Sequence, residues 1–301
     1  MTTLDQSLIA PTPVEAAAPT KVSLWRGLLS SPEGWIGLTL AVVVLTIIVI
    51  GPIAAPYDPN RSGVGVPNSG VSSDHLLGTD SFGRDVLSRF LSGGRSVIVV
   101  PVIAITIAYA IGASLGMLGA YRGGKTDRFV TRLLDLLLAL PGLLIVLLII
   151  AGLGTSALVL IAAVAVVFIA GAGRLVRGSA QAVVTSDYVA AANARGETTR
   201  AILVREVLPN ISGPIIADFA LRLTWAVLFV AGLNFLGLGK QPPSSDWGLM
   251  ISQGREYLDI APLATLVPAA GIAALAIAFN LIGDALTRHL SPETRQRGLR
   301  L

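Results

Sequence analysis

The sequence has no cysteine and few charged residues. The absence of cysteine excludes disulfides, thiolate metal sites and a cysteine nucleophile. Only 13% of the 301 residues are charged, compared with roughly 25% in a soluble domain, which excludes a water-soluble globule, a disordered chain and a coiled coil. Because 53% of the residues are hydrophobic, the composition indicates an all-α, polytopic membrane protein.

Five long intervals carry no charge, and they predict where the chain crosses the membrane, because a charge at the bilayer centre costs roughly 2.5–3.5 kcal/mol. Four of them are single spans: 34–57, 96–121, 223–239 and 260–283. The third is short, and we expect it to begin near Ile211. The fifth, 136–173, would be about 57 Å long as one helix, so it must fold back, at Gly152–Ser156. The prediction is six spans.

Lysine and arginine are divided unequally between the two sides that six spans create. With both termini inside, fifteen bases lie on the inner side and six on the outer side, and Arg222 lies within a span. We therefore expect cytoplasmic termini. The predicted parts are a flexible tail over 1–34, the first span with an outer segment over 35–94, a core of five spans over 95–287 and a second tail over 288–301. The net charge of +4 reflects this bias and indicates no nucleic-acid partner.

Two inner segments carry recognisable patterns. Gly119–Thr126 matches the phosphate-binding pattern G-x-x-x-x-G-K-[ST], but it follows a long apolar helix rather than a strand. We interpret it as a tight turn that binds no nucleotide. The loop from Arg174 to Asn210 has an alanine-rich stretch at 189–195, ended by Gly196, which predicts short helices on the inner face. Such helices would present a docking surface.

This inner loop resembles the coupling loop of ABC-importer permeases, whose pattern is E-A-A, three residues, Gly and, after a gap, an ending in x-Leu-Pro. The matching residues are Ala190, Ala191, Ala192, Gly196, Leu208 and Pro209. Ala190 stands where the family has Glu, and Glu206 stands where it has an apolar residue or His. Any salt bridge of the family's Glu must be absent here or be made by Glu197 or Glu206. The resemblance implies that the loop 187–210 couples to ATPases.

Three further stretches narrow the resemblance to the C-type permease subunit of the peptide, dipeptide and nickel importers. They are His75–Arg89, with the pattern H-x-x-G-T-D-x-x-G-R-D-x-x-S-R, the turn and helix Gly119–Pro141, and the motifs within 236–248 and 279–284. The resemblance implies a type I importer permease fold with no cofactor, no metal and no enzymatic activity of its own, in a bacterial inner membrane.

The same resemblance implies partners and a substrate. The partners are a B-type permease, two ATPase subunits or domains that bind ATP and Mg, an extracytoplasmic solute-binding protein and membrane lipid. The expected solute is a di- or oligopeptide, with nickel or another small solute as the alternative. A self-sufficient secondary transporter is the rival from another class. A membrane enzyme is disfavoured because H-E-x-x-H and G-x-S-x-G are absent and the only histidines, His75 and His289, lie on opposite sides.

In the outer segment, apolar residues recur at helical spacing from Asp80 to Gly93, which predicts an interfacial helix capped by Asp80 or Ser81. Asp85 and Arg89 are four residues apart and are expected to pair. His75 is expected to be a cap or turn residue rather than a metal ligand. Residues that form a structural brace, or alternatively contact the binding protein, are Asp80, Arg84, Asp85, Arg89 and Trp247.

Charges within the predicted spans are costly and therefore informative. Asp218 and Arg222 share a helix face, so we expect either a structural pair or residues that line the path. Asp135 and Asp284 lie near the cytoplasmic ends of their spans, where they can face water or cap helices. Gly112-x-x-x-Gly116 in the second span predicts a close contact with a neighbouring helix.

Overall fold

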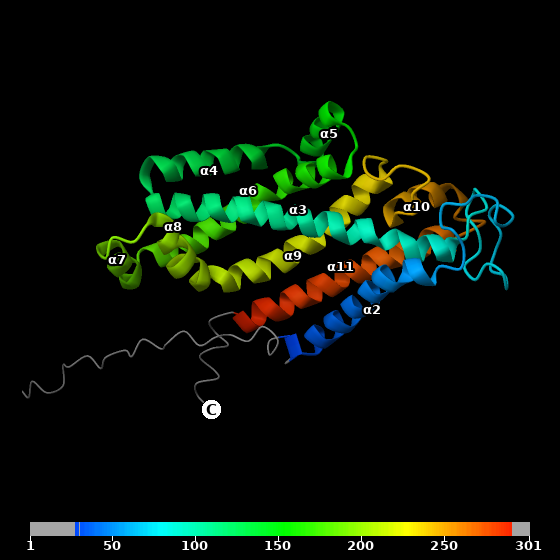
Figure 1. Ribbon diagram of the computed structural model, residues 1–301, viewed down its shortest axis with the longest axis horizontal. Helices are drawn as coiled ribbons and strands as arrows, with labels where there is room; N and C mark the ends of the chain where they lie inside the picture. Colours follow the sequence, from blue (N-terminus) through cyan, green and yellow to red (C-terminus); the bar gives the residue numbers. More distant parts are fainter. Residues whose placement is uncertain (1–27, 30, 291–301) are drawn as a thin grey trace, which may run out of the picture.

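The computed structural model describes residues 28–29 and 31–290, and within them every regular element is helical (Figure 1). The long elements are α2 (Pro32–Ala54), α3 (Val86–Arg122), α6 (Ala157–Val184), α9 (Leu208–Phe235) and α11 (Leu263–Leu290), with the shorter α4 (Gly124–Ala139) and α5 (Gly142–Leu153) between α3 and α6. The loops contain α7 (Asp187–Ala194), α8 (Thr199–Ile202), the π-helical turn η2 (Leu203–Val207), α10 (Trp247–Gly254) and the 3-10 turn η3 (Arg255–Tyr257). Most of the tails expected at 1–34 and 288–301 lies outside the described residues.

Within the described residues, five helices are long and apolar enough to cross a membrane, and α4 with α5 forms a sixth candidate span that is bent by 86°. The bend falls at Leu140 and Pro141, where the backbone is extended, because the proline ring disfavours a helical conformation in the residue before it. The number of spans and the all-α fold class predicted from the sequence are confirmed.

The fold-back within 136–173 is also confirmed. Helix α5 ends at Leu153, Gly154 follows with a φ of +83°, and the hydroxyl of Ser156 caps α6 by accepting from the Val159 N–H. The expected start of this pair of spans at residue 136 is wrong, since α4 begins at Gly124. The sequence criterion failed because charged residues occupy the first turns of α4 and interrupt the charge-free interval.

The predicted interfacial helix over Asp80–Gly93 is wrong as well. Residues 80–85 form a turn in which the Asp80 carboxylate accepts the N–H groups of Phe82 and Arg84, and Gly83 has a φ of +66°. The helix begins only at Val86, capped by Asp85, and α3 then continues without a break for 37 residues to Arg122. Apolar spacing could not reveal this turn, because it depends on side-chain hydrogen bonds and a left-handed glycine.

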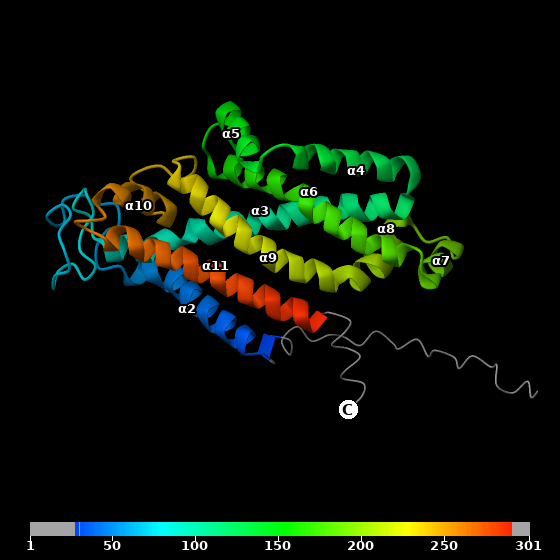
Figure 2. The same cartoon turned by 180° about the vertical axis from the view of Figure 1, so that it is seen from behind.

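Helix α3 lies at the centre of the bundle and makes its closest contact with α6. A Cβ on Gly112 would lie 2.6 Å from the Ile169 carbonyl oxygen, and one on Gly116 would lie 2.5 Å from the Gly173 carbonyl oxygen. The two glycines therefore allow the backbones to approach, as their spacing predicted. Helices α9 and α11 pack side by side on the other side of α3, and α2 packs against α11 (Figures 1 and 2).

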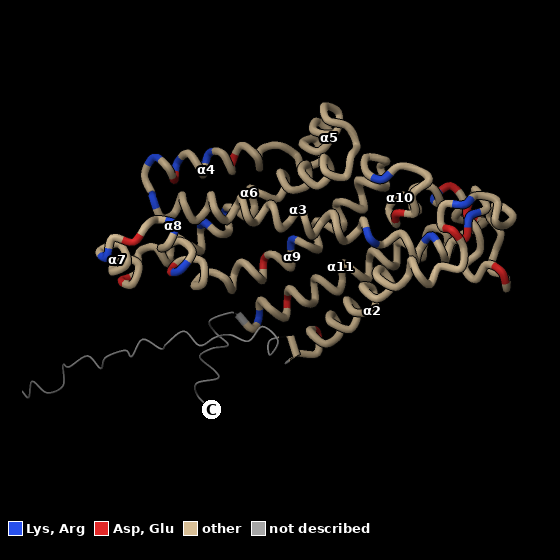
Figure 3. Tube along the Cα trace, in the orientation of Figure 1, with Lys and Arg blue, Asp and Glu red and all other residues tan. Residues whose placement is uncertain are grey.

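Charged residues gather at the two ends of the bundle, with few between them (Figure 3). One end carries α7, α8 and the turn between α3 and α4, and we call it the inner end. The other carries α10 and the segment 55–85, and we call it the outer end. Helix α9 runs between the two ends.

Candidate functional site

The inner loop packs onto the bundle through an apolar seam. Val189 and Ala192 of α7 are fully buried and contact Val176 and Ala180 of α6 together with Ile202 of α8. The Tyr121 hydroxyl of α3 donates a hydrogen bond of 2.5 Å to the Asn193 side chain. The loop is therefore packed directly onto α3 and α6.

The opposite side of the loop presents small residues to solvent. Ala190, Ala191 and Gly196 are exposed, whereas Ala192 faces the seam. Gly196 ends α7 with a φ of +75°, and no atom lies within 4 Å of the position that a Cβ would take there, so the surface beside it is open. Tyr188 and Val204 are apolar and more than 40% exposed on the same loop. The loop therefore exposes small and large apolar side chains on the side away from the bundle.

The loop departs from the coupling-loop pattern at Ala190 and Glu206, and the structure shows the surroundings of both positions. Arg195 and Glu197 form an ion pair of 2.6 Å directly after α7, which gives the loop a salt bridge although Ala190 has no carboxylate. Glu206 makes no ion pair within the described part of the chain; it lies in the π-helical turn 203–207 that leads into Leu208 and Pro209 at the start of α9. No sequence signal indicated this turn, although such turns are frequent at functional sites.

Asp218 and Arg222 pair within the membrane span of α9. Arg222 Nε lies 2.5 Å from Asp218 Oδ2, and the Tyr109 hydroxyl of α3 donates to the same carboxylate oxygen. The Arg222 guanidinium lies against Gly171 of α6, where a Cβ would come within 2.3 Å of its Nη1. The cluster thus joins α3, α6 and α9. The i,i+4 spacing predicted the ion pair, but Tyr109 and Gly171 were not singled out.

Further ion pairs join helices near the inner end. Arg177 of α6 donates two hydrogen bonds, of 2.5 and 2.6 Å, to the Asp127 carboxylate of α4. Arg174 of α6 lies 2.5 Å from Asp135 of α4, so Asp135 has a partner on a neighbouring helix, whereas Asp284 is exposed. The turn inside the Gly119–Thr126 pattern is formed by Gly123 and Gly124, both with positive φ, between two helices.

At the outer end, Arg89 is a buried cation that connects distant segments. Its guanidinium donates to the carbonyl oxygens of Pro59, Pro243 and Ser244 at 2.9–3.2 Å, and only 1% of the residue is exposed. Its Nε lies 3.4 Å from Asp80, not within pairing distance of Asp85. The expected Asp85–Arg89 pair is therefore wrong, because Asp85 sits at the start of α3 and caps that helix.

Asp80 and Asp85 of the outer segment each have side-chain partners. Arg84 Nε donates to Asp80 at 2.6 Å, and Arg84 Nη2 donates to the side-chain oxygen of Gln253 in α10 at 2.9 Å. Asp85 accepts from Ser88 and lies 2.9 Å from His75 Nδ1. No group of residues in the described ranges could hold a metal ion. His75 is a buried turn residue that is hydrogen-bonded to Asp85, and the outer residues form an internal network.

Trp247 and Asp246 fix the start of α10. Trp247 is fully buried, donates from its indole N–H to the Phe90 carbonyl oxygen at 2.7 Å and stacks on the Phe90 ring. Asp246 caps α10 by accepting from the N–H groups of Gly248 and Leu249, and it also accepts from Ser96 and Asn234. Burial raises the pKa of the Asp246 carboxyl, and these four donors stabilise its ionised form. Asp246, Ser96 and Asn234 were not singled out as site residues from the sequence.

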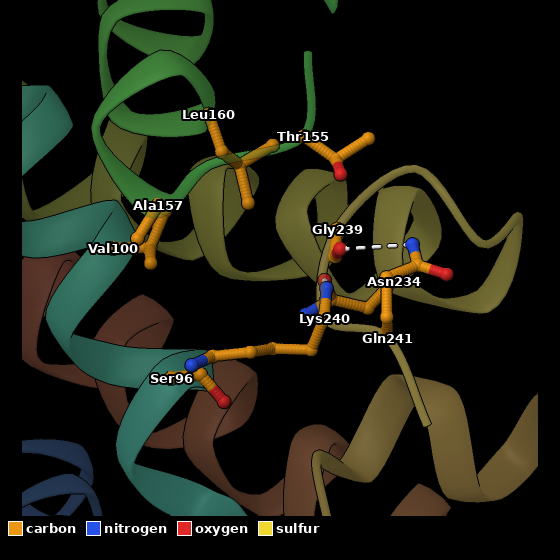
Figure 4. A pocket seen from close by; sticks show the side chains of 9 residues that line it. All are labelled: Ser96, Val100, Thr155, Ala157, Leu160, Asn234, Gly239, Lys240 and Gln241. Atoms are coloured by element: carbon orange, nitrogen blue, oxygen red, sulfur yellow. Dashed lines mark hydrogen bonds between the residues drawn. The ribbon is translucent and has the colours of Figure 1, made fainter. Parts of the chain in front are cut away.

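A cavity of about 250 Å³ opens beside this cap, between α3, α6 and the loop after α9. Lys240 extends along one side of it toward Ser96 (Figure 4). The lining residues are Ser96, Val100, Thr155, Ala157, Leu160, Asn234, Gly239, Lys240 and Gln241. The volume is below the roughly 300–1,000 Å³ of most small-molecule sites, so we assign no solute to the cavity.

Comparisons with known proteins agree with this architecture. The family model for the binding-protein-dependent transport system inner membrane component matches residues 108–296. Similar proteins include the glutathione transport system permease protein GsiD of Pectobacterium atrosepticum, 34% identical over 272 residues, with 90% of each chain covered. The dipeptide transport system permease protein DppC of Haemophilus influenzae is 33% identical over 295 residues, which cover 96% of this chain and all of the relative.

A solved structure shares the fold. The MetNI methionine ABC transporter in inward-facing conformations contains a chain that superposes with a TM-score of 0.55 at 16% identity, over 68% of this chain and 96% of that chain. The resemblance to importer permeases drawn from the sequence, and the fold that it implied, are therefore confirmed.

Proposed function

We propose that this chain forms half of a translocation path for di- or oligopeptides. The premise is that it belongs to the family of binding-protein-dependent transport system inner membrane components and is a permease subunit of an ABC importer. A second permease of the B type forms the other half, two cytosolic ATPase subunits or domains hydrolyse ATP, and an outer binding protein delivers the solute.

The inner loop is the observation that carries this proposal. Its buried residues hold it on α3 and α6, and its exposed residues Ala190, Ala191 and Gly196 leave a surface for an ATPase. The loop continues through η2 directly into α9, so a displacement of the loop is passed to a helix that reaches the outer end. Because a ligand shifts a two-state equilibrium only by its different affinities for the two states, the ATPase must dock on this loop differently in each state.

The substrate class is proposed from the relatives. One is named for dipeptide transport and another for glutathione transport, and glutathione is itself a short peptide. Nickel or another small solute is the alternative. No His or Cys cluster capable of binding a metal lies in the described ranges, which favours peptide over direct binding of a bare metal ion by this chain.

Co-purification tests the proposal. The tagged chain is extracted from native membranes in mild detergent, and stoichiometric companions are identified by mass spectrometry. We expect a second permease, two ATPase subunits or domains and a solute-binding protein, whose affinities for dipeptides, glutathione and nickel then identify the solute. Recovery of the chain alone, active in vesicles without ATP, would contradict the proposal and favour a secondary transporter.

A further inference from the structure

Helix α4 carries a row of cations on its exposed face near the inner end. Lys125, Arg128 and Arg132 are all exposed, and at 3.6 residues per turn they lie on one side of the helix together with Phe129. Figure 3 shows these bases along α4 beside the inner end. They span about 10 Å along the helix axis at ~1.5 Å per residue.

No acidic side chain within residues 31–290 forms an ion pair with this row. Asp127 lies on the other side of α4 and is held by both guanidinium nitrogens of Arg177, and Asp135 pairs with Arg174. In the described part of the chain, none of the three cations forms an ion pair, and Arg128 only donates to the backbone oxygen of Gly124 at 3.3 Å. The buried face of α4, with Val130 and Leu134, packs against α3 and α6 and fixes the direction in which the cations point.

Large apolar side chains are exposed on the same face of α4 as these cations and on α5. Phe129 is 69% exposed and Leu136 64% exposed. Beyond the bend, α5 exposes further leucines, namely Leu143, Leu144, Leu147 and Leu148. The exposed face of α4 thus combines three cations with the apolar side chains of Phe129 and Leu136.

We propose that this face of α4 binds an anionic phospholipid of the inner leaflet, with the headgroup phosphate on Lys125, Arg128 and Arg132 and an acyl chain along Phe129 and Leu136. A phosphate supplies the negative charge that residues 31–290 do not place beside these cations, and Arg132, the deepest cation, can extend its side chain toward the headgroup level. The α4 cations lie on the same side as the base-rich inner loops, where the cytoplasmic leaflet is expected. The site does not depend on which solute is transported.

Lipid titration of the purified complex tests this site. Binding of phosphatidylglycerol and of phosphatidylcholine is measured by native mass spectrometry for the wild type and for the triple variant K125Q/R128Q/R132Q. Each cation near a membrane surface strengthens anionic lipid binding roughly fivefold, so we expect the triple variant to lose roughly 100-fold in phosphatidylglycerol affinity and to bind phosphatidylcholine as before.

A matched control removes the same charge from the outer end. The variant R61Q/R95Q/K240Q also loses three exposed cations, and we expect its phosphatidylglycerol affinity to stay close to that of the wild type. Equal losses in both triple variants, or no loss in the α4 variant, would overturn the proposal.

A second measurement remains informative if the triple variant does not fold. The chain contains no cysteine, so Phe129→Cys gives a single attachment point for a spin label in the complex reconstituted in nanodiscs that contain phosphatidylglycerol. We expect the spin label to collide with dissolved oxygen and to be protected from a water-soluble nickel relaxant, as a label that faces lipid would be. Protection from both reagents would show that a partner protein covers α4, and accessibility to the nickel relaxant would show that the face lies in water; either result contradicts the proposal.

Discussion

At the scale of single residues, the charges in this protein divide into those that hold segments together and those left exposed. Arg89 and Asp246 are both buried, and each satisfies several polar groups at the outer end. Such groups are costly to bury alone, but they define one arrangement when every donor has an acceptor. The sequence identified Arg89 as part of the outer segment, but it could not identify the carbonyl oxygens that Arg89 contacts.

Replacement of Arg89 tests this arrangement. Arg89→Met removes the donors to Pro59, Pro243 and Ser244 and leaves Asp80 with fewer partners, so we expect a loss of about 3–5 kcal/mol in the free energy of unfolding. The measurement is thermal unfolding of the detergent-purified complex followed by tryptophan fluorescence. Arg61→Met, which removes an exposed arginine of the same segment, should change the midpoint little. Equal midpoints for both variants would show that the network contributes no stability.

The Asp218–Arg222 pair allows a double-mutant cycle. Asp218→Asn and Arg222→Gln each leave one uncompensated charge in the span, whereas the double variant leaves none. We therefore expect the double variant to unfold closer to the wild type than the sum of the single effects, with a coupling energy of about 0.5–3 kcal/mol. If the pair is structural, an assembled double variant keeps its uptake. Loss of uptake in that variant would instead place the pair on the path.

At the scale of elements, close helix contacts depend on where glycine occurs. On α3, Gly112 meets the backbone of α6, whereas Gly178 on α6 has open space around its Cβ position. The spacing of Gly112 and Gly116 predicted a contact, but only the packing shows that α6 is the partner. The bend between α4 and α5 was likewise only partly predictable. Pro141 predicts a break in the helix, but neighbouring helices set the direction of the bend.

Gly112 and Gly178 allow a matched pair of alanine substitutions. Gly112→Ala should force α3 and α6 apart and destabilise the protein by about 1–3 kcal/mol. Gly178→Ala, at an exposed helical position, should stabilise it by about 0.5–1 kcal/mol, because alanine loses less backbone entropy on folding. Unfolding midpoints of the two purified variants check the sign of each effect. A stabilising Gly112→Ala would contradict the close contact.

At the scale of the whole molecule, α9 links the inner loop to the loop before α10. Its inner end continues from η2, and near its outer end Asn234 donates to the Asp246 cap. A conformational change at the inner surface therefore has a continuous helical route to the outer cavity. The proposed coupling predicts that bulk added to the inner surface acts without disturbing the fold.

Gly196 provides the test of coupling. Gly196→Trp adds a large side chain to the proposed docking surface and should abolish substrate-stimulated ATP hydrolysis by the assembled complex while membrane insertion stays intact. Gly196→Ala carries the same backbone strain of roughly 1–2 kcal/mol at positive φ without the bulk, and it should keep most of the stimulation. Stimulation retained by Gly196→Trp would argue against this docking site, and loss in both variants would point to strain instead of docking.

The sequence alone determined the number of spans, the fold-back at Gly152–Ser156, the Asp218–Arg222 pair and the family, because the cost of a charge in the membrane and the spacing along a helix act on residues close in sequence. Only the tertiary structure decided where α3 begins, which carbonyl oxygens Arg89 contacts, and that Tyr109 and Gly171 complete the cluster around Arg222. Those contacts join residues tens to more than a hundred positions apart, and helix packing brings them together in a way that local spacing does not encode.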